Sequence, residues 1–165
     1  MKKADIYQNL YSFLASHPAE IKEWVTSADL FLCDNGCKLD AKTENPGGSI
    51  LITYTHRKSD KRICRIYVGS DGCKAYPYGH NFASANNILS ILPESMLNTM
   101  PNNGRDCTGC ATEQPDIITH SFRYTYKGNS YNKCKHEGFG FSLDHAAERT
   151  QLMIWLEMEV AYVQL

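Results

Sequence analysis

Three cysteines and a histidine between residues 107 and 136 are the residues whose types and spacing could do chemistry. Cys107 and Cys110 flank a Thr-Gly pair, and Cys134 lies two residues before His136. Thiolate and imidazole groups are the ligands that Zn²⁺ takes in tetrahedral structural sites, which often place two ligands on one tight turn. Gly109 could adopt the positive φ that such a turn needs. The spacing therefore predicts a zinc site formed by Cys107, Cys110, Cys134 and His136.

The fourth ligand of this site stays open. Two ligands at positions i and i+2 of a strand share a face, but they converge on one ion less readily than a Cys-x-x-Cys turn does. Cys33, Cys37 or His145 could supply the ligand instead. Two interpretations need no metal: thiols without a ligand role, and a redox pair at Cys107 and Cys110. A redox pair of the thioredoxin type lies between a strand and a helix, whereas this pair follows a loop and precedes a predicted strand.

The composition sets the class of protein. The chain has 165 residues, a net charge of −1, 42% apolar residues and seven cysteines. This length supports one domain with a substantial core, and the near-neutral charge gives no general attraction to nucleic acid or anionic membranes. We see no apolar run that could span a membrane and no export signal at the start. We therefore expect a soluble cytoplasmic protein, in which an odd number of cysteines favours free thiols or metal ligands over disulfides.

The periodicity of apolar residues predicts the elements that must position these groups. The expected helices cover residues 4–15, 18–32, 84–100 with a break at Pro93, and 144–163. The expected strands cover residues 49–56, 62–68, 73–78, 117–126, 131–136 and a short run at 139–141. Residues 38–48 are polar and contain Pro-Gly-Gly, so we expect a loop there.

The order of these elements repeats along the chain. Residues 49–100 and 107–163 both run strand, strand, strand, helix, and the repeat is one of pattern more than of residues. Duplication and chance similarity both stay open. We therefore expect one α+β domain over residues 1–165, with an N-terminal helical segment at 1–32. Its antiparallel sheet would come from two strand–strand–strand–helix halves, with helices packed on one face.

Carboxylates in the last expected helix are candidate ligand-binding groups. Glu157 and Glu159 lie in an otherwise apolar segment. A carboxylate there either reaches solvent, which is the simpler interpretation, or faces a cavity, where it needs a partner.

Both expected hairpin turns are basic and are interleaved with tyrosines. The first carries Arg57, Lys58, Lys61, Arg62 and Arg65, and the second carries Arg123, Lys127, Lys133 and Lys135. Such a mixture can bind single-stranded nucleic acid through stacking and phosphate contacts. Lysine and arginine also protect exposed strand edges from aggregation, and we favour this second interpretation.

The C-terminal half resembles an uncharacterised bacterial family. Its members share a Cys-x-x-Cys, a tyrosine-rich hairpin over glycine, a Tyr-x-x-Cys and a Phe-x-Phe before a last helix. The matching positions are Cys107, Cys110, Gly128, Tyr131, Cys134, Phe139 and Phe141. This resemblance implies no activity. The order of strands and helices is also similar to GyrI-like effector-binding modules, whose two halves form a cleft for small cationic or aromatic ligands. That resemblance implies a cleft glutamate, here Glu157 or Glu159.

Three classes of function follow. We favour a non-enzymatic domain that binds a small molecule in a cleft lined by Tyr54, Tyr124, Tyr126 and Glu157, with zinc as a structural cofactor. The second class is a thiol-redox or zinc enzyme that uses Cys107 and Cys110. The third is a nucleic-acid or protein interaction module that uses the basic hairpins, with nucleic acid the less favoured partner. No association with a membrane is expected.

Overall fold

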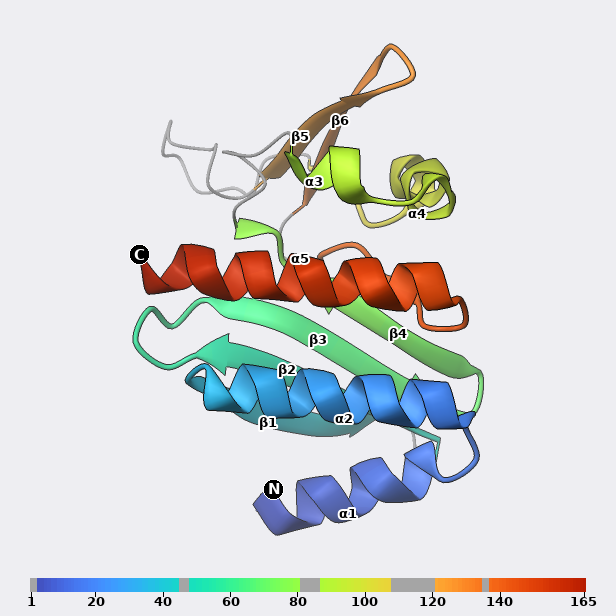
Figure 1. The fold of residues 1–165 in the computed structure, drawn as a ribbon, viewed down its shortest axis with the longest axis vertical. Helices are drawn as coiled ribbons and strands as arrows, with labels where there is room; N and C mark the ends of the chain where they lie inside the picture. The colour runs from blue at the N-terminus through green and yellow to red at the C-terminus, as the bar shows by residue number, and fades with distance from the viewer. Residues whose placement is uncertain (1–2, 45–47, 81–86, 108–120, 135–136) are drawn as a thin grey trace.

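The computed structural model describes residues 3–44, 48–80, 87–107, 121–134 and 137–165 of an α+β protein (Figure 1). The helices are α1 (Lys3–Leu14), α2 (Ala19–Asp34), α3 (Asn87–Ile91), α4 (Glu94–Thr99), the 3-10 helix η2 (Met100–Asn102) and α5 (Ala146–Gln164). The strands are β1 (Cys37–Glu44), β2 (Ser49–His56), β3 (Arg62–Gly69), β4 (Gly72–Pro77), β5 (Ser121–Tyr126), β6 (Asn129–Cys134) and β7 (Phe141–Ser142). The two N-terminal helices and the α+β class are as the sequence predicts.

Five strands form an antiparallel sheet in the order β1-β2-β3-β4-β7. Alternate side chains of a strand point to opposite faces, so one face of β2 and β3 can be apolar while the other meets solvent. The register places the apolar residues of the two strands directly opposite one another. The pairs are Ile50 with Val68, Ile52 with Ile66, and Tyr54 with Cys64, and all six side chains are buried. This face carries the main core of the protein.

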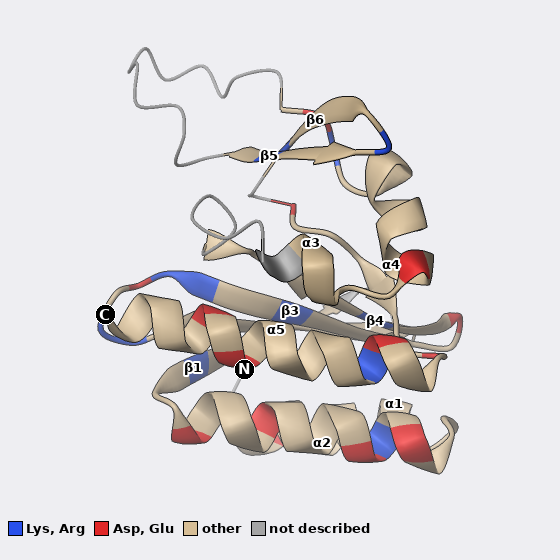
Figure 2. Ribbon diagram, turned by 45° about the horizontal axis from the view of Figure 1, so that its top comes forward, with Lys and Arg blue, Asp and Glu red and all other residues tan. Residues whose placement is uncertain are grey.

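Helices α2 and α5 lie side by side in front of the sheet (Figures 1 and 2). The indole Nε1 of Trp24 in α2 donates a hydrogen bond of 2.7 Å to the carbonyl oxygen of Arg149 in α5. Helix α1 contacts β2 and β3 and buries Ile6, Leu10 and Leu14, which recur at the spacing of one helical face. None of the described helices combines the length and the apolarity that crossing a membrane requires.

The β5–β6 hairpin forms a second, two-stranded sheet beside α3 and α4 (Figure 1). Its turn places Lys127 at φ 48° and Gly128 at φ 78°, the pair of positive values that a tight hairpin turn needs. Phe139 joins this layer to the main core, because its ring lies 4.9 Å from that of Phe122 in β5 and 6.4 Å from that of Trp155 in α5.

The segment that we expected to be a loop at residues 38–48 is mostly strand β1. Cys37, Leu39 and Ala41 alternate with Lys38 and other exposed residues, and the first three face the helices. This alternation is weakly apolar, so composition alone indicates a loop. The segment is a strand because eight successive residues pair with residues of β2.

The two expected strand–strand–strand–helix halves do not form equivalent units. The third strand of the second half, β7, pairs with β4 of the first half, with Phe141 opposite Ala75. Strands β5 and β6 stay apart from this sheet. The halves at 49–100 and 107–163 therefore contribute differently to the main sheet, which takes three strands from the first half and only β7 from the second.

Candidate functional site

The β5–β6 hairpin forms one wall of a hollow of about 690 Å³. Helix α3 supplies a residue of the opposite wall. The lining residues are Leu89, Arg123, Tyr124, Thr125, Ser130, Tyr131 and Asn132. Ligand sites commonly have this size and combine apolar or aromatic walls with a few polar groups.

Two tyrosines form the aromatic part of the hollow. Tyr124 and Tyr131 lie directly opposite each other on the two strands, and their rings stack at 5.0 Å between centroids with 19° between planes. Burial, followed by the nearby Tyr131 and Asp106, raises the pKa of Tyr124. The Tyr124 hydroxyl therefore stays neutral at physiological pH.

The polar part of the hollow comes from the neighbouring cross-strand pair. Arg123 and Asn132 lie directly opposite each other, and the Arg123 side chain is exposed. Asn132 Nδ2 donates a hydrogen bond of 3.4 Å to the carbonyl oxygen of Cys107. Asn132 Oδ1 is buried and accepts no hydrogen bond from any residue that the structure describes. Arg123 and Asn132 thus point to the hairpin face opposite to that of the tyrosine pair, and both pairs line the hollow.

The four ligand-binding residues expected from the sequence do not form one cleft. Tyr124 lines the hollow, and Tyr126 donates a hydrogen bond of 2.8 Å to Asn98 Oδ1 of α4. Tyr54 is wrong as a cleft residue, because its side chain is 0% exposed on the core face of β2. Glu157 is exposed on α5, outside the lining of the hairpin hollow.

The other glutamate of α5 is the buried one. Glu159 is 0% exposed and accepts hydrogen bonds from the backbone N–H of His80 at 2.7 Å and from Trp155 Nε1 at 3.2 Å. The solvent-exposed interpretation is therefore confirmed for Glu157 and wrong for Glu159. The signal was present in the sequence, because Glu159 lies on the same helical face as Trp155 and Val163.

Two of the expected metal ligands are described, and they lie on one face of the chain. The N–H of Cys107 donates to the carbonyl of Asn132, and the N–H of Cys134 donates to the carbonyl of Arg105, both at 2.8 Å. This pairing places Asp106 opposite Lys133 on one face and both cysteines on the other. Cys134 is 2% exposed, whereas Cys107 is partly exposed.

Cys110 and His136 lie outside the described residues. Within the part of the chain that the structure describes, no three His, Cys, Asp or Glu side chains gather as a metal site would require. Cys33, Cys37 and His145 are all described, so they are wrong as further ligands of Cys107 and Cys134.

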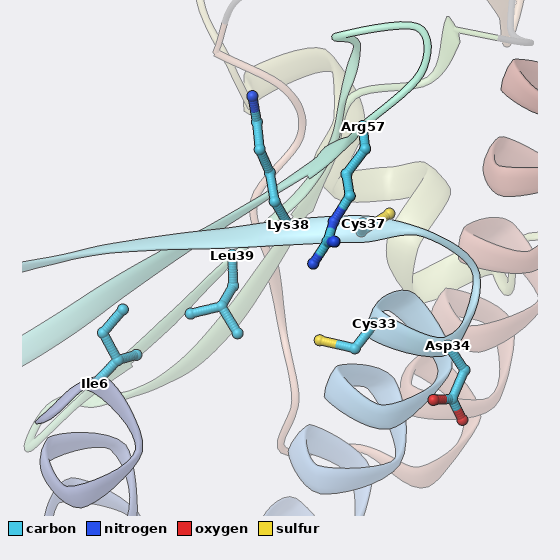
Figure 3. Close-up of a pocket in the computed structure, with 7 residues that line it drawn as sticks. All are labelled: Ile6, Cys33, Asp34, Cys37, Lys38, Leu39 and Arg57. Carbon is cyan, nitrogen blue, oxygen red and sulfur yellow. The ribbon is translucent and has the colours of Figure 1, made fainter. Parts of the chain in front are cut away.

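A second hollow, of about 410 Å³, lies among α1, the end of α2 and the start of β1 (Figure 3). Its lining residues are Ile6, Cys33, Asp34, Cys37, Lys38, Leu39 and Arg57. The Asp-Asn-Gly turn between Cys33 and Cys37 lets the helix end and the strand begin, with Gly36 at φ 81°. The two cysteines that flank this turn therefore share one hollow.

A buried carboxylate lies beside this second hollow. Asp29 of α2 is 7% exposed, and its oxygens accept hydrogen bonds of 2.8 Å each from the hydroxyls of Tyr7 and Tyr54. Cys33 Sγ also donates to Asp29 Oδ1, at 3.7 Å. Burial first, and the charge of Asp29 next, raise the pKa of Tyr54. Sequence reasoning missed this cluster. The available signal was that Asp29 lies one helical turn after Val25 and therefore on the apolar face of α2.

The thiols of the sheet are held in the protonated form. Cys64 and Cys73 are both buried, and burial raises the pKa of each to about 12. Burial also raises the pKa of Cys37 to about 11, with a further increase from Cys33 and an opposing decrease from Arg57. Thiolates are the reactive form, so these three residues are unsuited to nucleophilic chemistry at neutral pH.

The resemblances drawn from the residues between Cys107 and Phe141 stay predictions. Comparison of the chain with family models, curated proteins and solved structures gives no match.

Proposed function

We propose that this protein binds a small molecule in the hairpin hollow. The observation that carries the proposal is a hollow of ligand size that is lined by the stacked pair of Tyr124 and Tyr131 and by the cross-strand pair of Arg123 and Asn132, whose Oδ1 has no donor among the described residues. A buried acceptor without a donor costs free energy, which a ligand donor could recover. Among the described residues that line this hollow there is no histidine, cysteine or carboxylate. That lining favours binding over acid–base or nucleophilic catalysis.

The lining also indicates the class of ligand. A flat aromatic body would pack on the half-buried ring of Tyr131. An N–H or O–H group would donate to Asn132 Oδ1, and an anionic group would pair with Arg123, whose guanidinium can bind a carboxylate through two parallel hydrogen bonds. We therefore propose a planar aromatic anion that carries at least one hydrogen-bond donor.

Indole-3-carboxylate is a suitable probe, because it is flat, carries one N–H and is anionic. We expect ligand-observed NMR to show binding, and indole-3-carboxamide to bind at least about tenfold more weakly, since it lacks the charge that Arg123 pairs with. Arg123→Gln should weaken binding of the carboxylate by a similar factor. Lys58→Gln, which removes an exposed cation outside the hollow, is the matched control. Equal affinity of wild type and Arg123→Gln for the carboxylate would contradict the proposal.

We also propose that Cys107 and Cys134 are two ligands of a structural zinc ion, together with Cys110 and His136. The supporting observation is that backbone pairing places the two thiols on one face, in diagonal positions across two paired segments. Such an ion would hold residues 105–107 against β6. The hydrogen bond from Asn132 to the Cys107 carbonyl would then couple the ion to the hairpin hollow.

Elemental analysis of protein purified without added metal tests this second proposal. We expect about one Zn²⁺ per chain, and loss of most of it in Cys134→Ser, because structural zinc needs all four ligands. Cys33→Ser, which alters a thiol away from this face, should keep the metal. A wild-type protein without metal, in which Cys107 and Cys110 readily form a disulfide, would instead favour the redox interpretation.

A further inference from the structure

The second hollow contains a cation that points across it. Arg57 follows β2, and its guanidinium extends past β1 toward the side of the hollow where Cys33 lies (Figure 3). Ile6 of α1 and Leu39 of β1 form an apolar wall on the other side (Figure 3). Ile6 is almost fully buried and Leu39 is half-buried, so this wall is continuous with the core.

The positive charge of Arg57 is not neutralised by any residue that the structure describes. Its side chain makes no ion pair or hydrogen bond with the residues that the structure describes. Lys38 points away and pairs with Asp60 at 3.1 Å, so its charge is already compensated (Figure 3). Asp34 lies at the rim, and its carboxylate is turned away from Arg57 (Figure 3). An anion in the hollow would therefore meet one available guanidinium.

Apart from Arg57, Lys38 and Asp34, the lining of the hollow carries no charged side chain. The Cys33 thiol donates a hydrogen bond to Asp29, which also accepts hydrogen bonds from the hydroxyls of Tyr7 and Tyr54. Cys37 stays protonated at neutral pH, since burial raises its pKa to about 11. The two thiols thus form a weakly polar floor. A cation on one side and an apolar wall on the other match a molecule with a charged head and an aliphatic body.

We propose that this hollow is a second binding site, which takes a small aliphatic carboxylate. The carboxylate pairs with Arg57, and the aliphatic chain packs on Ile6 and Leu39 above the thiols of Cys33 and Cys37. One guanidinium and one apolar wall fit a singly charged head with a short chain better than a phosphate ester, which would need more cations. The site shares no residue with the hairpin hollow, so the two proposals stand or fall separately.

Cys33 provides a direct readout, because it is a partly exposed thiol that lines the hollow. We expect hexanoate to slow the alkylation of Cys33 by N-ethylmaleimide. Peptide mass spectrometry measures the rate of this alkylation. At a concentration of about ten times its Kd, hexanoate should reduce the rate about tenfold, in proportion to the free fraction of sites. Cys107, which is also partly exposed but lies elsewhere, is the internal control and should react at an unchanged rate. Hexanol, which has the same chain and no charge, should give little protection.

Variants of Arg57 separate charge recognition from simple apolar binding. Arg57→Gln should raise the Kd for hexanoate at least about tenfold, because it removes a charge-assisted hydrogen bond, and Arg57→Lys should retain part of the affinity. Lys58→Gln, one residue along and outside the lining, should bind as the wild type does. Isothermal titration calorimetry with hexanoate gives the same comparison without relying on Cys33. Equal Kd values for wild type and Arg57→Gln, equal protection by hexanol, or no binding of hexanoate would each overturn the proposal. A Cys33–Cys37 disulfide formed in preference to ligand binding would assign the hollow to thiol redox chemistry.

Discussion

Replacement of Phe139 with alanine is expected to lower the free energy of unfolding by about 3–5 kcal/mol, as for other large buried aromatic side chains. Phe139 is 0% exposed and contacts the rings of Phe122, Tyr124, Phe141 and Trp155. These partners come from the hairpin, from β7 and from α5. The cavity left by the substitution would therefore separate the hairpin layer from the main core, and urea-induced unfolding would measure the loss.

The matched control for Phe139→Ala is Leu30→Ala, since Leu30 is a large apolar residue with 57% of its surface exposed. Exposed substitutions of this kind usually change stability by less than about 0.5 kcal/mol. If Phe139→Ala cost no more than this control, Phe139 would not join the hairpin layer to the main core as described.

Tyr54→Phe is expected to destabilise the protein by about 1.5–3 kcal/mol, the range for hydrogen bonds to charged groups. The change keeps the ring in the core and removes only the hydroxyl that donates to Asp29 Oδ1. Asp29 would then depend on Tyr7 and on the longer contact from Cys33. Because the carboxylate is buried, water cannot readily replace the missing donor.

Tyr11→Phe is the control for Tyr54→Phe, because Tyr11 lies on the exposed side of α1. Chemical denaturation of both variants should show a clear loss for Tyr54→Phe and almost none for Tyr11→Phe. Equal stability of the two would mean that the Tyr54 hydroxyl contributes nothing beyond the packing of its ring.

Most of the helices and the longer strands could be predicted from local patterns. The stripe of Ile21, Trp24 and Val25 in α2 buries one face of that helix, and the apolar alternation of β2 and β3 survives in the sheet. Strand β1 could not be predicted, because Leu39 and Ala41 are weak signals among charged neighbours. Strand β1 forms because it pairs with β2, and this tertiary interaction overrides the weak β-strand propensity of the β1 residues.

The topology and the site depended on contacts between residues that are far apart in the sequence. Phe141 pairs with Ala75, and nothing in a two-residue strand indicates its partner. Tyr54 and Tyr124 both lie on strands in which apolar and polar residues alternate. The side chain of Tyr54 nevertheless lies in the core, whereas that of Tyr124 lines a hollow. Residue type identified the candidate groups, whereas only the packing of helices on one sheet face decided which of them a ligand can reach.

The buried thiols have a consequence for how the protein withstands oxidation. With a pKa of about 11, Cys37 has on the order of one thiolate in ten thousand molecules at pH 7, and the fractions for Cys64 and Cys73 are smaller still. Peroxides and disulfides react with thiolates, so these cysteines are chemically quiet while the fold persists. The fold itself protects these three buried thiols, so they need no reducing partner. Oxidation of Cys37, Cys64 or Cys73 would therefore report that the protein has unfolded.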